Sequence, residues 1–254
     1  MLFRSAKGAT PAGFVLTLAI PRVDEQWLEP FARALGEDAA AFDCPLLGGD
    51  TVSTPGPLTL SITAFGKVPA GTMVRRDRAR VGDLIAVTGT IGDAVLGLKC
   101  LKGERITEEP ELCEELIGRY RIPQPRNRLA PAVRKFAHAA MDVSDGLAGD
   151  LAKLCAASGV SATVQVSEIP FSNAAHTILS LGAASLESLL SGGDDYEILC
   201  TLPEASWGDF EAAAQSAGVD VAVIGRIKEG SQTPSFLDVS GAPMTLKRMS
   251  YSHF

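Results

Sequence analysis

The 254-residue sequence lacks any apolar run long enough to cross a bilayer. Its longest apolar stretches, at residues 14–20 and 84–87, are far shorter than the ~20 residues that a membrane-spanning helix requires. The first residues also lack the basic start, apolar core and small-residue cleavage site of a signal peptide. We therefore expect a cytoplasmic protein with no membrane partner.

Positive charge is scarce. Lys and Arg total 23 against 30 Asp and Glu, which gives a formal net charge of -7. Binding to a nucleic-acid backbone requires clustered Lys and Arg, so nucleic acid is not an expected partner. A small anionic ligand can still bind near acidic residues if a divalent cation lies between them.

Cysteines and histidines are few, and familiar catalytic motifs are missing. The five cysteines are odd in number and form no C-x-x-C pair, which predicts reduced core residues. His138, His176 and His253 are isolated in the sequence, and we expect structural or surface roles for them. There is no G-x-S-x-G elbow, Walker sequence or protein-kinase signature set. The sequence therefore offers no obvious histidine or serine chemistry.

The first part of the chain predicts a small layer of strands and one helix. We expect a buried strand over 13–21 and a helix that follows Asp24, its candidate N-cap. Pro30 either moves the start of this helix towards residue 27 or bends it. Residues 44–68 predict a hairpin with one buried face, because Leu58, Leu60 and Ile62 alternate with polar residues.

The pattern of apolar and polar residues changes near residues 67–75, where we place a domain boundary. Residues 1–67 and 68–254 then form two domains. Beyond it, strand and helix patterns alternate. They include LIAVTG, GDAVLGLKCL, AAMDVS, GLAGDLAKLCAA, VSATVQVS and YEILCTL. This order predicts an α+β, or α/β layered, domain with helices packed against a mixed sheet.

Three acidic corners contain glycine and adjoin apolar stretches: LLGGDT, MDVSDG and SGGDDYE. Glycine permits tight turns and a close approach of the backbone to a ligand. Carboxylates on such corners suit magnesium, which keeps several waters and bridges to substrate phosphates. Asp142 is the most informative of these acids, because it replaces an apolar residue at the end of a buried strand.

Each corner also has a structural interpretation. Asp145 can cap the helix that follows it, and Asp150 is most simply a solvated helix residue. The Gly-Gly-Asp segments can be ordinary acidic turns. Residues 89–93 are a weak phosphate-loop candidate and more simply a strand-to-helix turn, while 75–80 is a basic loop in which one arginine could clamp a phosphate.

Taken together, these motifs resemble the thiamine-monophosphate kinase family. That family belongs to a superfamily with aminoimidazole ribonucleotide synthetase, selenophosphate synthetase and a hydrogenase maturation factor. The resemblance runs from about residue 7 to residue 254. It rests on the segments KGATP, LLGGDT, RRDRARVGD, VTGTIGDA, MDVSDGL, PFS, SGGDDYE and the final YSHF.

The resemblance implies ATP-dependent transfer of the γ-phosphoryl group to thiamine monophosphate, with Mg2+, to give thiamine diphosphate. The implied ATP contacts are Gly49, Asp50, Arg76 and Ser144. The implied magnesium ligands are Asp50, Asp142 and Asp145. The implied contacts to the thiamine end are Asp194 and Tyr251, since a carboxylate and an aromatic face suit a cationic heterocycle.

This reaction does not require a strong general base. A phosphate monoester has a second pKa of about 6, so the acceptor oxygen is already largely ionised at neutral pH. Positioning and charge neutralisation must then provide most of the catalysis. We accordingly assign no catalytic general base.

This sequence departs from the family pattern at its amino terminus. The family carries an earlier segment with G-D-D, S-T-D-like and N-L-S-D sequences, and this sequence shows none of them. Residues 1–67 therefore resemble the remnant of a ferredoxin-like ATP-binding and dimerisation domain. Residues 68–254 resemble the mixed-sheet domain of the aminoimidazole ribonucleotide synthetase-like type. Residues 2–5 also match the translation of a common sequencing adapter, so we expect residues 1–5 to be artefactual.

Several expectations follow from this departure. We expect a homodimer for the full-length protein, and an exposed strand edge and weakened activity for this chain. Two other functions are compatible with the sequence: a noncatalytic nucleotide-binding subunit whose partner supplies the absent ligands, and a related synthetase acting on another phosphate acceptor.

Overall fold

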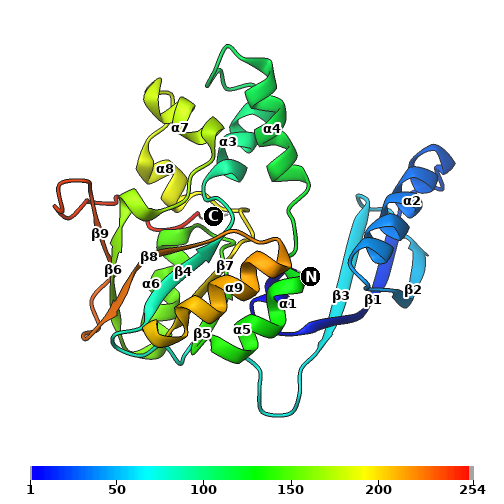
Figure 1. The fold of residues 1–254 in the computed structure, drawn as a ribbon. Coiled ribbons are helices and arrows are strands. Elements are labelled where there is room, and N and C mark those ends of the chain that lie inside the picture. The colour runs from blue at the N-terminus through cyan, green and yellow to red at the C-terminus, as the bar shows by residue number, and fades with distance from the viewer. Residues whose placement is uncertain (1, 252–254) are drawn as a thin grey trace.

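The computed structural model describes residues 2–251, which form two sheets and their covering helices (Figure 1). The elements of the first part are α1 (Leu2–Ser5), β1 (Thr10–Ile20), α2 (Glu25–Ala41), β2 (Leu46–Ser53) and β3 (Thr59–Lys67). The three strands form one sheet in the order β2-β1-β3. Asp24 is the N-cap of α2, as predicted, and its side chain accepts the N–H of Gln26 at 3.1 Å. Pro30 lies inside this helix.

The predicted hairpin of β2 and β3 is wrong. Both strands pair with β1, β2 in parallel and β3 antiparallel, so β1 lies between them. The Gly-Gly-Asp segment is therefore part of β2 and not a corner. A parallel pair needs a crossover connection, and α2 provides it between β1 and β2.

The expected buried face of β3 is only partly covered. Leu60 and Ile62 pair with Leu18 and Leu16 of β1, yet they remain 43% and 54% exposed. Only Ala64 at the other end of β3 joins the small core beneath α2. The alternation of apolar residues thus indicates the strand correctly, but not what covers it.

The second part contains a six-stranded mixed sheet in the order β5-β7-β4-β8-β6-β9. Its strands are β4 (Leu84–Thr88), β5 (Ala139–Asp142), β6 (Ser161–Gln165), β7 (Ile198–Leu202), β8 (Val221–Lys228) and β9 (Ser235–Leu237). All neighbours are antiparallel except β6 and β9. The predicted α+β fold with a mixed sheet is confirmed.

Helices cover both faces of this sheet. They are α3 (Asp93–Leu101), α4 (Pro110–Arg121), α5 (Ala130–Phe136), α6 (Leu147–Ser158), α7 (Asn173–Ser180), α8 (Leu186–Ser191) and α9 (Trp207–Ala217). The fully buried strand β4 contributes Ile85 and Val87 to the core shared with α6, and Leu84 and Ala86 to the core shared with α5 and α9. Helices α3, α4, α7 and α8 form a separate cluster at the top of Figure 1.

The segments before β1 and after β3 run beside β5, the edge strand of the large sheet. The Lys7 carbonyl accepts the N–H of Val74 at 3.2 Å, and the Arg75 carbonyl accepts the N–H of Ala140 at 3.2 Å. The Lys7 ammonium donates to the Ala140 carbonyl at 2.6 Å. These contacts join the first part of the chain to the second near the end of β5.

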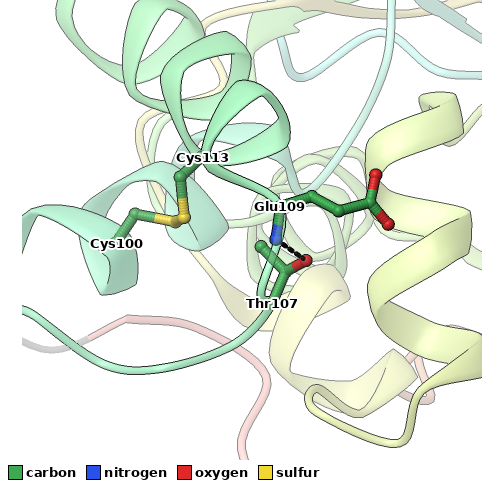
Figure 2. The surroundings of a disulfide bond; sticks show 4 residues. All are labelled: Cys100, Thr107, Glu109 and Cys113. Atoms are coloured by element: carbon green, nitrogen blue, oxygen red, sulfur yellow. Dashed lines mark hydrogen bonds between the residues drawn. A yellow bond between two sulfur atoms is a disulfide. The ribbon is translucent and has the colours of Figure 1, made fainter.

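The prediction of five reduced cysteines is wrong for two of them. Cys100 of α3 and Cys113 of α4 form a disulfide bond (Figure 2). The two helices pack closely, since a Cβ at Gly97 would lie 2.1 Å from the carbonyl oxygen of Leu116. This packing brings together cysteines 13 positions apart, which a search for C-x-x-C cannot detect. The other three cysteines are buried and free, as predicted: Cys44, Cys155 and Cys200.

Within residues 2–251, none of the helices combines the length and apolar character needed to span a membrane.

The disulfide gives a first testable prediction. Closing a loop of this length stabilises a protein by about 3 kcal/mol through the entropy of the unfolded chain. The double variant C100S/C113S should therefore lose about that much free energy of unfolding in denaturant titrations under oxidising conditions. Reductant should lower the wild type to the same value and leave the double variant unchanged. Equal stabilities under oxidising conditions would contradict the pairing.

Candidate functional site

One buried carboxylate holds the loop that follows β5. Asp150, in the first turn of α6, is fully buried. Its Oδ2 accepts the N–H groups of Ser144 at 2.8 Å and Asp145 at 2.9 Å, and its Oδ1 accepts the Lys153 ammonium at 2.9 Å. The prediction that Asp150 is a solvated bystander is therefore wrong. Helical side chains point back towards the helix N-terminus, which explains how Asp150 reaches the loop before its own helix.

Asp145 does not cap α6. The N-cap is Gly146, with φ 106° and no side-chain capping bond. A Cβ at Gly146 would lie 2.6 Å from the carbonyl carbon of Ser191, so glycine is required there for contact as well as for conformation. The Asp145 Oδ2 instead accepts the Lys153 ammonium at 2.6 Å.

The SGGDDYE segment lies against this loop through main-chain hydrogen bonds. The N–H of Asp194 donates to the Ser144 carbonyl at 2.9 Å, and the N–H of Tyr196 donates to the Val143 carbonyl at 2.7 Å. Asp194 and Tyr196 both have a positive φ, 70° and 53°. A non-glycine residue in this region is uncommon and is often found at functional sites. Two predicted corners thus meet in the structure.

The two neighbouring acids of this segment have different environments. Asp195 is buried and accepts the N–H groups of Gly92 at 2.8 Å and Ala94 at 3.2 Å, at the start of α3. Burial raises the pKa of Asp195 to about 8, although those two N–H groups oppose the shift. Asp194, by contrast, is only partly buried. The structure thereby answers which acid is turned to the interior, a question the sequence leaves open.

Tyr196 lies at the centre of the acidic residues and is absent from the predicted set. Burial raises the pKa of its phenol to about 12, and a hydrogen bond with Asp194 and the charges of Asp194, Asp142 and Asp145 add to the shift. The aromatic residue directly after two aspartates was a usable signal in the sequence. Asp142 itself has a raised pKa, first because it is partly buried and then because Asp150 and Asp145 lie near it, while Lys7 opposes the shift.

The carboxyl-terminal segment completes the site. The N–H of Tyr251 donates to the Asp145 carbonyl at 2.9 Å, and the Ser250 hydroxyl donates to the same oxygen at 3.2 Å. A cleft of about 750 Å³ opens here. Its lining residues are Val95, Ser185, Glu187, Ser188, Ser191, Gly192, Lys247, Arg248, Met249, Ser250 and Tyr251. Tyr251, next to the Asp145 loop, is 48% exposed.

Arg76 lies on the segment beside β5, where the carbonyl of its neighbour Arg75 accepts the N–H of Ala140. The charges of Asp142, Arg76 and Asp77 all act on the Lys7 ammonium. The pKa of Lys7 is lowered, mainly by burial and also by Arg76. The predicted ATP contact Arg76 and the predicted metal ligand Asp142 are thus brought to the same region.

Gly49 and Asp50 lie elsewhere. Both are exposed on β2, which stands apart from β5 in Figure 1. A Cβ at Gly49 would lie 1.8 Å from the Leu16 carbonyl oxygen, so this glycine is required by the packing of β2 on β1. The structure does not bring Asp50 to Asp142 within one chain.

The loop fits magnesium only with help from a substrate. Within the described part of the chain, no group of three or more Asp, Glu, His or Cys residues could hold a metal ion. Asp142 and Asp145 offer two carboxylates, which is the number that Mg2+ takes when waters and substrate phosphates complete its coordination. Asp150 already uses both oxygens on N–H donors.

A second buried acid, Glu197, joins the elements around the site and is also absent from the predicted set. Glu197 is 1% exposed and accepts Arg126 at 2.5 Å, Arg119 at 3.0 Å and the Thr88 hydroxyl at 2.6 Å. Its carbonyl accepts the N–H of Val143 at 2.8 Å. Glu197 therefore ties α4 and the end of β4 to the strand that carries the acidic segment. The sequence does not distinguish this buried glutamate from an exposed one.

Comparisons with known proteins agree with this arrangement. The chain matches the AIR synthase related protein N-terminal domain over residues 5–68 and the corresponding C-terminal domain over residues 80–236. It is 41% identical to the thiamine-monophosphate kinase of Caulobacter vibrioides, over 98% of this chain and 70% of that protein. It is 38% identical to the thiamine-monophosphate kinase of Escherichia coli, over 98% of this chain and 76% of that protein.

The chain belongs to the thiamine-monophosphate kinase family.

Solved structures of that family have the same fold. The thiamine-monophosphate kinase of Stenotrophomonas maltophilia superposes with a TM-score of 0.84 and 38% identity, covering 92% of this chain and 74% of that one. AaThiL complexed with AMPPCP and TMP superposes with a TM-score of 0.83 and 29% identity, covering 98% of this chain and 76% of that one. The hydrogenase maturation protein HypE, at 20% identity and a TM-score of 0.79, shares the fold alone.

The role of Asp150 can be tested by substitution with alanine. One oxygen of Asp150 accepts both N–H groups, so asparagine could keep these bonds, whereas D150A removes the acceptor. We expect a loss of at least about 2 kcal/mol of unfolding free energy and faster hydrogen exchange at the Ser144 and Asp145 amides. The same substitution at Asp209, an exposed aspartate of another helix, is the matched control. Unchanged exchange at both amides in D150A would contradict the role.

Asp195 gives a pH-dependent prediction. Its folded-state pKa of about 8 lies above the ordinary 3.8, so the folded protein keeps this proton to a higher pH than the unfolded chain does. The wild type should therefore lose stability relative to D195N as the pH rises through this interval. Denaturant titrations at several pH values measure the difference. A difference that stays constant across the interval would show that Asp195 is ionised throughout.

Proposed function

We propose that the protein transfers the γ-phosphoryl group of ATP to the phosphate of thiamine monophosphate, with Mg2+ as cofactor, and forms thiamine diphosphate. The observation that carries the proposal is the meeting of the Asp142–Asp145 loop, the Asp194–Tyr196 segment and Tyr251, the last of which also lines the cleft. Relatives named thiamine-monophosphate kinases, and a related structure complexed with AMPPCP and TMP, support the same reaction.

The acidic loop suits the metal-bound phosphates. Asp142 and Asp145 would hold Mg2+, which neutralises phosphate charge when bound. Ser144 lies between them and would contact the nucleotide. Because Asp150 fixes the backbone at Ser144 and Asp145, this loop keeps its geometry before a substrate arrives.

The other side of the site suits the substrates. Arg76 would bind the triphosphate, since a guanidinium matches phosphate oxygens well. Asp194 and the partly exposed ring of Tyr251 would hold the cationic thiamine end. With an acceptor oxygen already ionised, the residues of this chain need to bind, orient and exclude water rather than remove a proton.

The remaining proposals concern assembly. Gly49 and Asp50 stay proposed contacts to ATP and, for Asp50, to the metal. Since they lie apart from Asp142 in one chain, a second chain would have to bring them to the site. The exposed Leu60 and Ile62 of β3 support a homodimer that covers this sheet. A cytoplasmic location stays a prediction from the sequence.

The reaction is tested by incubating the chain with ATP, Mg2+ and thiamine monophosphate and measuring thiamine diphosphate by chromatography. We expect formation of thiamine diphosphate, and a loss of at least about 100-fold in D142N and in D145N, a larger loss than an outer-shell change causes. D209N should retain activity. Phosphorylation of a different acceptor in place of thiamine monophosphate, or ATP binding without turnover, would contradict the proposal.

A further inference from the structure

Lys7 is a cation beside the candidate site, and the predicted contacts give it no role. Its backbone lies between the buried residues Ala6 and Ala9 and is fixed on both sides. Gly8 has φ 70°, and a Cβ there would lie 2.6 Å from the Cβ of Arg134. The Gly8 carbonyl also accepts a hydrogen bond from the Arg134 guanidinium. The start of the Lys7 side chain is therefore held in place.

The side chain then reaches the edge strand β5. The Lys7 ammonium donates to the carbonyl of Ala140, two residues before Asp142, at 2.6 Å. An ammonium has three N–H donors, and this bond uses one of them. The predicted phosphate-binding Arg76 and the acid Asp142 are both close enough to act on its charge.

Burial makes the charge of this ammonium costly. The Lys7 side chain is partly buried, and the nearby cation Arg76 adds repulsion. Asp142 and Asp77 compensate in part, but Asp142 is also the residue that would turn to a bound metal. A phosphate group beside Asp142 would interact favourably with both cations.

We propose that Lys7 is a further phosphate-binding residue of this site, whose ammonium contacts a phosphoryl oxygen of a bound substrate next to Asp142. The proposal rests on the proposed function for the identity of the substrates. The phosphate belongs either to ATP or to thiamine monophosphate, and kinetic constants for each substrate distinguish the two.

The test separates the charge of Lys7 from its hydrogen bond to Ala140. K7R keeps a cation, K7Q keeps an uncharged N–H donor, and K7M keeps neither. K102M, at an exposed lysine after α3, is the matched control. For each purified protein we would measure the binding of Mg2+–AMPPCP by calorimetry, the KM for ATP and for thiamine monophosphate, and the thermal midpoint.

We expect K7Q and K7M to raise the KM of one phosphate-bearing substrate, or the Kd of Mg2+–AMPPCP, by at least about tenfold. K7R should raise the same constant less. Added KCl should weaken binding of that substrate more in the wild type than in K7Q, because a charge contact is screened by salt. A purely structural role predicts the reverse order, in which K7Q resembles the wild type. Wild-type constants in K7Q would overturn the proposal.

The same experiment keeps the two proposals apart. If the wild type binds AMPPCP in a Lys7-dependent manner but forms no thiamine diphosphate, the proposed function fails and the phosphate contact stands. If thiamine diphosphate forms at the wild-type rate and with wild-type constants in K7Q, the function stands and the Lys7 contact fails.

Discussion

The site depends on a single buried carboxylate. Asp150 has no exposed surface, so its charge must be compensated inside the protein, and the N–H groups of Ser144 and Asp145 and the Lys153 ammonium do so. These bonds turn the backbone at residues 143–145. The carbonyls of the same three residues then accept N–H groups from two distant segments, at Tyr196, Asp194 and Tyr251. One side chain thus sets the loop that joins three parts of the sequence.

Negative charge is therefore concentrated around this loop, and few cations neutralise it. Asp142, Asp145 and Asp194 all act on Tyr196, and Asp150 acts on Asp142. Lys153 pairs with two of these acids, and Lys7 opposes the shift at a third. Such a surplus favours binding of a divalent cation or a cationic ring. The proposed magnesium–nucleotide and thiamine contacts follow from this charge distribution, not from a nucleophile or base.

The sequence predicts most of the local structure of the second part. The apolar runs of β4 and β5 predict strands, and the structure has them, because each face of that sheet packs on a helix. The same reasoning fails for β3, since the apolar alternation of Leu60 and Ile62 does not specify what covers it. It also fails for the pairing of Cys100 with Cys113, which requires knowing that α3 packs on α4.

The candidate site is predictable in part for the same reason. Asp142 is visible as an acid at the end of an apolar strand. Asp150 and Glu197 are not visible, because a buried acid on a helix or beside an acidic segment has the same sequence pattern as an exposed one. Their roles depend on N–H groups and arginines that only the tertiary fold places near them.

The central claim, that metal-bound ATP lies against the loop fixed by Asp150, is tested most directly by nuclear magnetic resonance with Mn2+ in place of Mg2+. Paramagnetic Mn2+ broadens the amide signals of nearby residues. We expect Mn2+–ATP to broaden the signals of Ser144 and Asp145 first, and Mn2+ alone to do so far less. Broadening confined to other segments, with these two signals unchanged, would contradict the account.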